Sequence, residues 1–425
     1  MVNFPPATSA DAVVPFLVPG TNLIVPGANG EPATVLDAVE AAAHQLERVR
    51  VHQVLPLRDR PHHAGQFGDR LRHVSYFLSS GLRPHWDAGT VDLIPNDLGQ
   101  VAAILRSTPG PKFMVLSTAP PDKHGFVSMG VSANHAAALL GEIPVFVEVN
   151  AQMPRTSGRN QLHLSQAVGW CEADYPLVTP PPPPITDLDR TIAALVAERI
   201  SDGATLQIGI GAVPDAVAEL LVERRELGIH TELMGDGIRI LIESGAATGS
   251  RKTVQRGQAI AGDALGSQAL YDFVDDNHYV NFWPTEETNN HANIAALDDF
   301  VAINATMQVD LLGQCASESL GTHYVSSTGG QADFMRGAAY SKGGHSFIVT
   351  HATAVNGTVS RIVATLAPGA VVTSHKNLVD KIVTEYGVAE LRGRTIADRA
   401  RSLIAIAHPN FRDELEQQAR SFGYL

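Results

Sequence analysis

The sequence predicts an α/β fold with two open-sheet domains, and three observations lead to this prediction. The chain has 425 residues, of which 44% are hydrophobic and 18% charged, so it is long enough for two domains with their own cores. Short β-branched runs alternate with helical patterns, which favours parallel sheets covered by helices. A run of five prolines, Pro180–Pro184, interrupts this alternation.

The first half of the chain contains four strand patterns and one long helical pattern. The helix is expected at 32–50, where apolar residues recur at steps of three and four. The β-branched runs predict strands at 21–27, 91–97, 113–118 and 145–150.

The proline run predicts a domain boundary. Consecutive prolines cannot continue a helix or a central strand, and they favour a stiff, extended connector. We therefore expect a first domain at 1–179, a linker at 180–186 and a second domain at 187–425. The alternative is a proline-rich surface loop inside one domain.

The second half repeats the same alternation. It predicts a helix at 191–200, a strand at 204–211, a helix at 214–226 opened by Pro214, and a strand at 229–234. Two later segments, 300–315 and 345–366, have the pattern of long paired strands. A mixed sheet is therefore expected in the second domain.

Composition excludes several classes of protein. The net charge is −13 at pH 7 and no Lys/Arg block occurs, which argues against a nucleic-acid partner. Cys171 and Cys315 are the only cysteines, both in apolar surroundings, which indicates buried thiols in a reducing compartment. No signal-peptide pattern or membrane-spanning apolar run occurs, so we expect a soluble cytoplasmic protein.

A metal site is not predicted. The chain has 17 histidines, but no HExxH motif and no regular His/Asp/Cys spacing.

The glycine turn at Gly209-Ile210-Gly211 stands between a predicted strand and a predicted helix. Glycines let a ligand approach the backbone, and a helix N-terminus offers free N–H groups that bind phosphate or an oxyanion. The turn is neither a dinucleotide-binding fingerprint nor a Walker loop. A tight turn without any function explains it equally well.

A second glycine-rich segment holds the pairs Gly329-Gly330 and Gly343-Gly344 with Lys342 between them. Glycine turns beside a lysine suit an anionic cofactor such as a pyrophosphate. Two hairpin turns are the alternative reading.

Glu232 ends a predicted strand just before a Gly-Asp-Gly turn at Gly235. At the carboxyl edge of a sheet, where open α/β folds bind ligands, it could serve as a general base or as a nucleophile. An ordinary surface acid is the alternative. Glu385 has a similar sheet-edge position, and Glu286, Glu287 and Asn289 belong to a polar run after an apolar strand.

Taken together, the segments resemble the acetyl-CoA hydrolase/transferase family, the branch of class I CoA-transferases that includes the 4-hydroxybutyrate CoA-transferases. The resemblance runs in order over nearly the whole chain. It implies two open-sheet domains of the CoA-transferase (NagB/RpiA-like) type and a homodimer. It is carried by DGATLQIGIGAVPDAV, LGIHTELMGDG, INATMQVDLLGQ, GGQADFMRGA, SKGGHS, VTEYGVAELRG and IAHPNFRDEL, with PPDKHGFVSMGVS and VFVEVNAQMPRTSG in the first half.

The resemblance also implies roles for individual residues. Glu232 matches the nucleophile, the amides of Ile210 and Gly330 match an oxyanion hole, and Asn289 and Glu385 match positions that orient the nucleophile. No metal is implied. Contacts to coenzyme A map to Gly209, Ile210, Gly211, Ala212, Val213, Met307, Ser326, Gly330 and Lys342.

One residue departs from the family pattern. Ser327 stands where many relatives have glycine, which predicts a stiffer loop or one shaped for a different acyl group.

The activity implied is transfer of CoA between a small acyl-CoA and a small carboxylate, such as 4-hydroxybutyrate, butyrate or acetate, through a glutamyl-CoA thioester. An acyl-CoA hydrolase using the same glutamate is the alternative. A protein that binds or senses CoA without turnover is a third.

Overall fold

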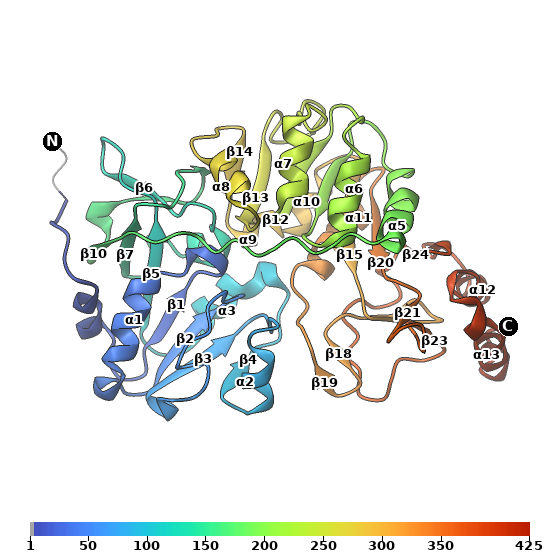
Figure 1. The fold of residues 1–425 in the computed structure, drawn as a ribbon, viewed down its shortest axis with the longest axis horizontal. Coiled ribbons are helices and arrows are strands. Elements are labelled where there is room, and N and C mark those ends of the chain that lie inside the picture. Colours follow the sequence, from blue (N-terminus) through green and yellow to red (C-terminus); the bar gives the residue numbers. More distant parts are fainter. Residues whose placement is uncertain (1–3) are drawn as a thin grey trace. The chain divides into compact units, whose positions relative to one another are not determined.

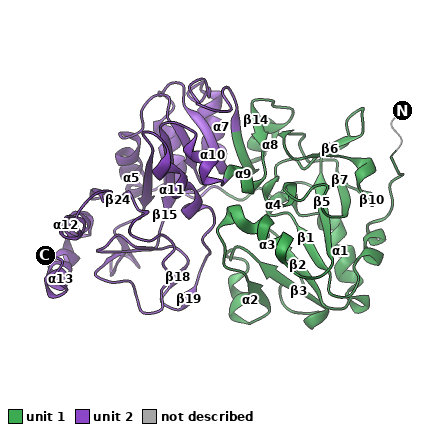
Figure 2. Ribbon diagram, turned by 180° about the vertical axis from the view of Figure 1, so that it is seen from behind, with its two compact units in different colours: residues 1–181, 260–288 green, residues 182–259, 289–425 purple. Residues whose placement is uncertain are grey.

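The computed structural model describes residues 4–425 and divides into two compact units (Figures 1 and 2). Unit 1 comprises Met1–Pro181 and Ile260–Thr288, and unit 2 comprises Pro182–Ala259 and Asn289–Leu425. The first boundary falls inside the predicted linker at 180–186. Residues 260–288, which the sequence assigned to the second domain, belong instead to unit 1.

Unit 1 is built on a seven-stranded parallel sheet in the order β10-β7-β5-β1-β2-β3-β4. Its strands are β1 (Asn22–Val25), β2 (Val49–Gln53), β3 (Leu71–Ser75), β4 (Val91–Leu93), β5 (Lys112–Thr118), β7 (Val145–Asn150) and β10 (Gly169–Ala173). The four strands predicted in this half are present, whereas β2, β3 and β10 carry charged or histidine side chains that obscured their pattern.

Smaller elements complete unit 1. The helices are α1 (Ala33–Ala41), α2 (Arg83–Asp87), α3 (Val101–Ser107), α4 (Asn134–Ala137), α8 (Gln268–Val274) and α9 (Thr285–Thr288). The further strands are β6 (Phe126–Ser128), β8 (Ser157–Gly158), β9 (Gln161–His163), β13 (Ala259–Ala264) and β14 (Val280–Phe282).

Helix α1 covers one face of this sheet. Val35 and Val39 pack in one apolar cluster with Leu23, Val51 and Val115, which lie on neighbouring strands. The predicted helix 32–50 is too long, because the chain turns after Ala41 and enters β2 at Val49.

The same face carries buried histidines next to this core. His73 of β3 lies beside Val51 of β2 in the sheet register, and His63 is 1% exposed. Burial, followed by neighbouring histidines, lowers the pKa of His63 to about 2 and that of His73 well below its usual range. Both rings are therefore neutral near pH 7.

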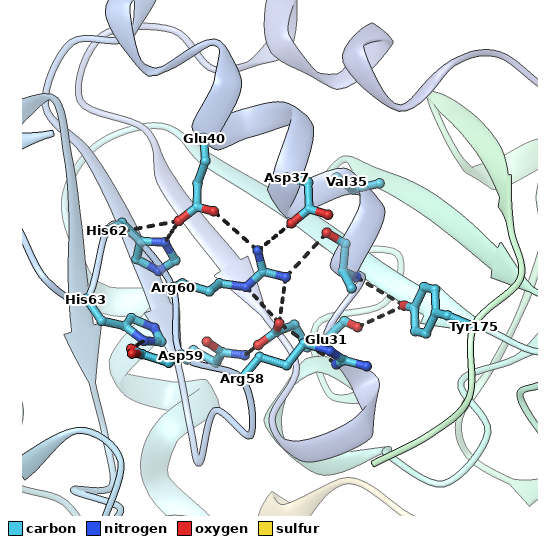
Figure 3. A network of polar contacts seen from close by, with 12 residues as sticks. Glu31, Val35, Asp37, Glu40, Arg58, Asp59, Arg60, His62, His63 and Tyr175 are labelled. Atoms are coloured by element: carbon cyan, nitrogen blue, oxygen red, sulfur yellow. Dashed lines mark hydrogen bonds and ion pairs between the residues drawn. The ribbon is translucent and has the colours of Figure 1, made fainter. Parts of the chain in front are cut away.

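A buried arginine joins α1 to the loop that follows β2 (Figure 3). The guanidinium of Arg60 contacts Glu31 at 2.7 Å, Asp37 at 2.9 Å and Glu40 at 3.3 Å. The side chains of Arg60 and Glu31 are 4% and 0% exposed. Removing the arginine leaves the fully buried Glu31 carboxylate with Arg58, 4.0 Å away, as its remaining cationic partner.

We expect Arg60→Met to lower the free energy of unfolding of unit 1 by about 3–5 kcal/mol. The measurement is urea unfolding followed by tryptophan fluorescence, since all three tryptophans, Trp86, Trp170 and Trp283, belong to unit 1. Arg48→Met is the control, because Arg48 and its partner Glu47 are 62% and 63% exposed. A variant as stable as this control would contradict the network's role.

Unit 2 contains strands in the order β25-β24-β20-β15-β11-β12. They are β11 (Thr205–Ile208), β12 (Gly228–Met234), β15 (Phe300–Ala305), β20 (His345–Val349), β24 (Lys381–Thr384) and β25 (Gly387–Glu390). These strands pair in parallel except for the antiparallel pair β24–β25, so the predicted mixed sheet is confirmed.

The long strands predicted at 300–315 and 345–366 are wrong in length. β15 ends at Ala305 and β20 at Val349, and the chain then forms short ladders. These are β16 (Gln308–Asp310) with β17 (Cys315–Ala316) and β23 (Ile362–Val363), β18 (Ser319–Leu320) with β19 (His323–Tyr324), and β21 (Thr353–Ala354) with β22 (Val359–Ser360).

The helices of unit 2 are α5 (Asp187–Ala197), α6 (Ala212–Leu220), α7 (Asp236–Glu243), α10 (His291–Ala295), α11 (Gln331–Tyr340), α12 (Ile396–Ile406) and α13 (Pro409–Ser421). α11 packs on β15, where Phe334 stacks on Phe300 with ring centroids 6.2 Å apart. None of the helices formed by residues 4–425 combines the length and apolar character needed to cross a bilayer.

Candidate active site

Glu232 lies near the carboxyl end of β12, on the face of the sheet that α11 covers. His230, two residues earlier on the same strand, contacts Phe300 of β15 and Phe334 of α11 edge-on. Because side chains alternate between the faces of a strand, Glu232 points to the same face as His230. It is therefore directed toward the N-terminus of α11.

Gly330, immediately before α11, is pressed against the Glu232 carboxylate. A Cβ atom added at Gly330 would lie 1.9 Å from Oε2 of Glu232 and 2.5 Å from Nδ2 of Asn289. The φ angle of Gly330 is −93°, so its backbone conformation is open to any residue. Glycine is needed at this position because a side chain would collide with the Glu232 carboxylate, and not because of the backbone conformation.

Asn289 holds the same carboxylate from a third segment. Its Nδ2 donates a 2.6 Å hydrogen bond to Oε2 of Glu232 and a longer contact of 3.4 Å to Oδ2 of Asp333. Asn289 and Asp333 are 1% and 4% exposed. Asp333, in the first turn of α11, fixes which way the amide of Asn289 faces; nothing in the sequence pattern singled it out.

The turn at Gly209–Gly211 follows β11, the strand beside β12. Thr231 Oγ1 donates to the carbonyl of Ile208 over 3.1 Å, so Glu232 lies level with the start of this turn. Ile210 is 43% exposed, and a Cβ at Gly235 would lie 2.9 Å from its Cγ2. Gly211 (φ 130°) is the N-cap of α6, which begins at Ala212 and not at the predicted Pro214.

Two predicted CoA contacts belong to the chain that connects β15 to α11. Met307 follows the end of β15 by two residues, and Ser326 precedes Gly330 by four. Their amides bond the carbonyls of Ala316 and Glu318. Chain continuity therefore keeps both near the carboxyl edge of the sheet.

Lys342 is not brought to Glu232. It follows the C-terminus of α11, whereas Gly330 precedes the N-terminus, and ten helical residues span about 15 Å. The Lys342 side chain is 86% exposed and pairs with Asp298 at 3.4 Å.

The expectation that Glu385 orients Glu232 is not met by the geometry. β24, which precedes Glu385, is separated from β12 by β20, β15 and β11, so the two strands lie about 19 Å apart. The Glu385 carboxylate instead accepts a 2.9 Å hydrogen bond from the amide of Ala352. The carboxylate that lies beside Asn289 is that of Asp333.

The other acidic candidates form ion pairs with arginines, and the two thiols are buried. Glu286 pairs with Arg106 at 2.7 Å and Glu287 pairs with Arg159. Burial raises the pKa of the Cys171 thiol to about 12 and raises that of Cys315 as well, so neither thiol ionises near neutral pH.

An acidic pair flanks the glycine turn on its helical side. Asp215 lies in the first turn of α6 and Asp236 in the first turn of α7. Burial, and then the charges of Asp236 and Glu219, raise the pKa of Asp215 to about 6. Asp215 therefore places a carboxylate in the first turn of α6, while Asp236 is paired with Arg239 at 3.2 Å.

We expect Asp215→Asn to stabilise unit 2 near pH 8 by roughly 1 kcal/mol after allowance for solvent screening. The folded state binds the Asp215 proton more tightly than the unfolded chain does, because the pKa of this carboxyl group in the unfolded chain is 3.8. The native protein therefore loses stability relative to the variant as pH rises from about 4 to about 6.

The measurement is urea unfolding by circular dichroism across this pH range. The exposed Glu223→Gln on the same unit serves as control. A difference between Asp215→Asn and the native protein that did not change with pH would contradict the raised pKa.

Comparison with known proteins identifies the family. The profile of the acetyl-CoA hydrolase/transferase N-terminal domain matches residues 7–181, and that of the C-terminal domain matches residues 266–419. The chain is 41% identical to the succinyl-CoA:cyclohexane-1-carboxylate CoA transferase of Geobacter metallireducens, over 96% of this chain and 93% of that protein.

Two further relatives agree. The 4-hydroxybutyrate coenzyme A transferase of Clostridium kluyveri is 42% identical over 81% of each chain. The crystal structure of 4-hydroxybutyrate CoA-transferase from Porphyromonas gingivalis superimposes with a TM-score of 0.84 at 35% identity, covering 98% of this chain and 97% of that one. The protein belongs to the acetyl-CoA hydrolase/transferase family and is an acyl-CoA:carboxylate CoA-transferase.

Proposed function

We propose that this enzyme transfers CoA between a small acyl-CoA and a small carboxylate, of the 4-hydroxybutyrate, butyrate or acetate kind, with Glu232 as the nucleophile of a ping-pong reaction. One observation carries the proposal: the Glu232 carboxylate is bound by Asn289 at 2.6 Å directly against the backbone of Gly330. A carboxylate held in this way beside the N-terminus of α11 points to one place, as a nucleophile requires.

The first half-reaction loads CoA onto the enzyme. An oxygen of Glu232 attacks the thioester carbonyl of acyl-CoA, and the C–S bond breaks to give an acyl-glutamyl anhydride and CoA thiolate. The thiolate attacks the glutamyl carbonyl of the anhydride. This step forms the Glu232–CoA thioester and releases the first carboxylate.

The second half-reaction runs these steps in reverse with a different acid. The incoming carboxylate attacks the glutamyl thioester carbonyl, which re-forms an anhydride and CoA thiolate. The thiolate then attacks the new acyl carbonyl, and Glu232 leaves as a carboxylate. The thioester energy is kept in a covalent bond throughout, so ATP hydrolysis is not needed.

Each step passes through an oxyanion, and the amides of Gly330 and Ile210 are the donors we propose for it. Gly330 is in contact with the Glu232 carboxylate, and Ile210 lies against the turn that follows it. In other enzymes, removing one oxyanion donor costs about 10²–10³ in turnover.

The same geometry favours one way of presenting CoA. Asp215 places a carboxylate in the first turn of α6, beside the glycine turn, and a negative charge there disfavours a pyrophosphate. We therefore assign residues 209–213 to the uncharged thioester end of CoA, together with Met307 and Ser326.

The decisive experiment is intact-protein and peptide mass spectrometry after incubation with butyryl-CoA or acetyl-CoA. We expect a CoA adduct on Glu232 that is discharged by adding acetate or another small carboxylate. An adduct that disappears in buffer alone would instead favour the hydrolase. CoA binding without an adduct or acyl exchange over a broad panel of acids would indicate a binding protein.

Glu232→Gln should abolish the adduct and reduce transfer by at least about 10⁴-fold, since the amide cannot act as the nucleophile. Glu223→Gln is the control, because it removes an exposed carboxylate from the same unit. Transfer by Glu232→Gln at a rate near that of the control would show that another group is the nucleophile.

Gly330→Ala should reduce transfer by at least about 10²-fold, because the added methyl group would overlap Oε2 of Glu232. The control is Gly81→Ala, where the nearest atom to the added Cβ is Ser79 Oγ at 3.9 Å. Normal adduct formation in Gly330→Ala would be incompatible with the geometry described above.

A further inference from the structure

Three buried histidine rings converge in unit 1 between α1 and β3. His62 and His63 lie in the turn that follows Arg60, and His73 lies on β3. One ring nitrogen of each lies within 4.8 Å of those of the other two. The three residues are 1%, 1% and 0% exposed.

Four ring nitrogens of these histidines have no protein partner within the described part of the chain. They are Nε2 of His62, Nε2 of His63 and both nitrogens of His73. Buried polar atoms are normally hydrogen-bonded, and several orphans at one point require an explanation. A neutral imidazole also carries one lone pair, which is the form that binds a metal.

Glu40 prepares one of these rings for coordination. Its Oε1 is 2.6 Å from Nδ1 of His62 and also accepts a 3.1 Å hydrogen bond from the His62 amide (Figure 3). A proton on Nδ1 leaves the lone pair on Nε2, which is the orphaned nitrogen. Carboxylate–histidine–metal chains in other proteins use this arrangement.

The surrounding charges also suit a cation. The ion pairs around the cluster include four carboxylates, from Glu31, Asp37, Glu40 and Asp59, and two guanidiniums, from Arg58 and Arg60. Asp37 and Asp59 are 72% and 79% exposed, so the buried charges are those of Glu31, Glu40 and Arg60. Two buried carboxylates against one buried guanidinium favour a cation.

We propose that His62, His63 and His73 bind one divalent transition-metal ion, with zinc as the natural probe, at a structural site that fastens the turn after Arg60 to β3. Imidazole is a preferred ligand for zinc, and three histidines leave one coordination position for water. The Asp59 carboxylate lies 3.8 Å from Nδ1 of His63, the ring nitrogen opposite the orphaned Nε2, where it can orient the ring.

The rings need little movement to reach a metal. With zinc–nitrogen bonds of about 2.1 Å, three nitrogens at 4.8 Å would each have to move inward by about 0.7 Å. No metal site was predicted from the sequence, because the criterion used was a regular spacing of ligand residues along the chain. That criterion does not detect ligands supplied by a turn and by a separate strand.

The experiment uses full-length protein without a histidine tag, stripped with a chelator and then dialysed against Zn²⁺ or Co²⁺. We expect one metal ion per chain by elemental analysis, a midpoint of thermal unfolding that rises with free metal, and for Co²⁺ the visible absorption of a four-coordinate site. Native protein that takes up no metal beyond trace amounts would overturn the proposal.

Single variants then identify the ligands. His62→Gln, His63→Gln and His73→Gln should each lose the bound ion, and Glu40→Gln should weaken binding about 10–100-fold. His44→Gln, which changes an exposed histidine of the same unit, should bind like the native protein. Equal retention of the metal by all these variants would place the ion elsewhere and refute the assignment.

Loss of metal through unfolding must be kept distinct from loss of a ligand. Tryptophan fluorescence reports on unit 1 and identifies any variant that fails to fold. The Co²⁺ spectrum and the shifted imidazole signals in the proton NMR spectrum of the native protein test histidine ligation without any substitution. A Co²⁺ protein lacking shifted imidazole signals would also overturn the proposal.

Discussion

The contact between Gly330 and the Glu232 carboxylate constrains most of unit 2. For the two to meet without a side chain between them, the carboxyl end of β12 and the N-terminus of α11 must converge, although about 100 residues separate them in the chain. β15 links the two elements, since Phe300 contacts both Phe334 on α11 and His230 on β12. The aromatic packing therefore sets the position of the carboxylate two residues farther along the strand.

The residues around the Glu232 carboxylate restrict its position. Asn289 donates a hydrogen bond to the carboxylate, Asp333 lies beside the amide of Asn289, and Gly330 closes the remaining side. The carboxylate and the groups that surround it therefore come from three separate segments of the chain: β12, the segment before α10, and the start of α11.

Local pattern was enough to predict the α/β class and the strands of the central sheets that have continuous apolar runs. It singled out Glu232 and the two glycine turns as candidates, but it offered no reason to choose Asp333. It also could not separate Glu385 from Glu232, because both follow apolar strands and only the order of strands in the sheet shows that three others lie between them. In the same way, nothing in the sequence around His73 indicates a site. Only the folded structure shows that β3 lies beside the turn that holds His62 and His63.

Unit 1 is discontinuous, and its two segments are joined by buried polar contacts (Figure 2). Asn29 Nδ2 donates to the hydroxyl of Tyr271 over 2.8 Å, and Ser132 Oγ donates to Asp263 over 2.8 Å. The two partners of each contact are more than a hundred residues apart in the chain, so the ribosome makes them at different times. The first unit therefore cannot complete its fold when the ribosome reaches the proline run, and it stays unfinished until residue 288 has emerged, by which time β11 and β12 of the second unit have already been made.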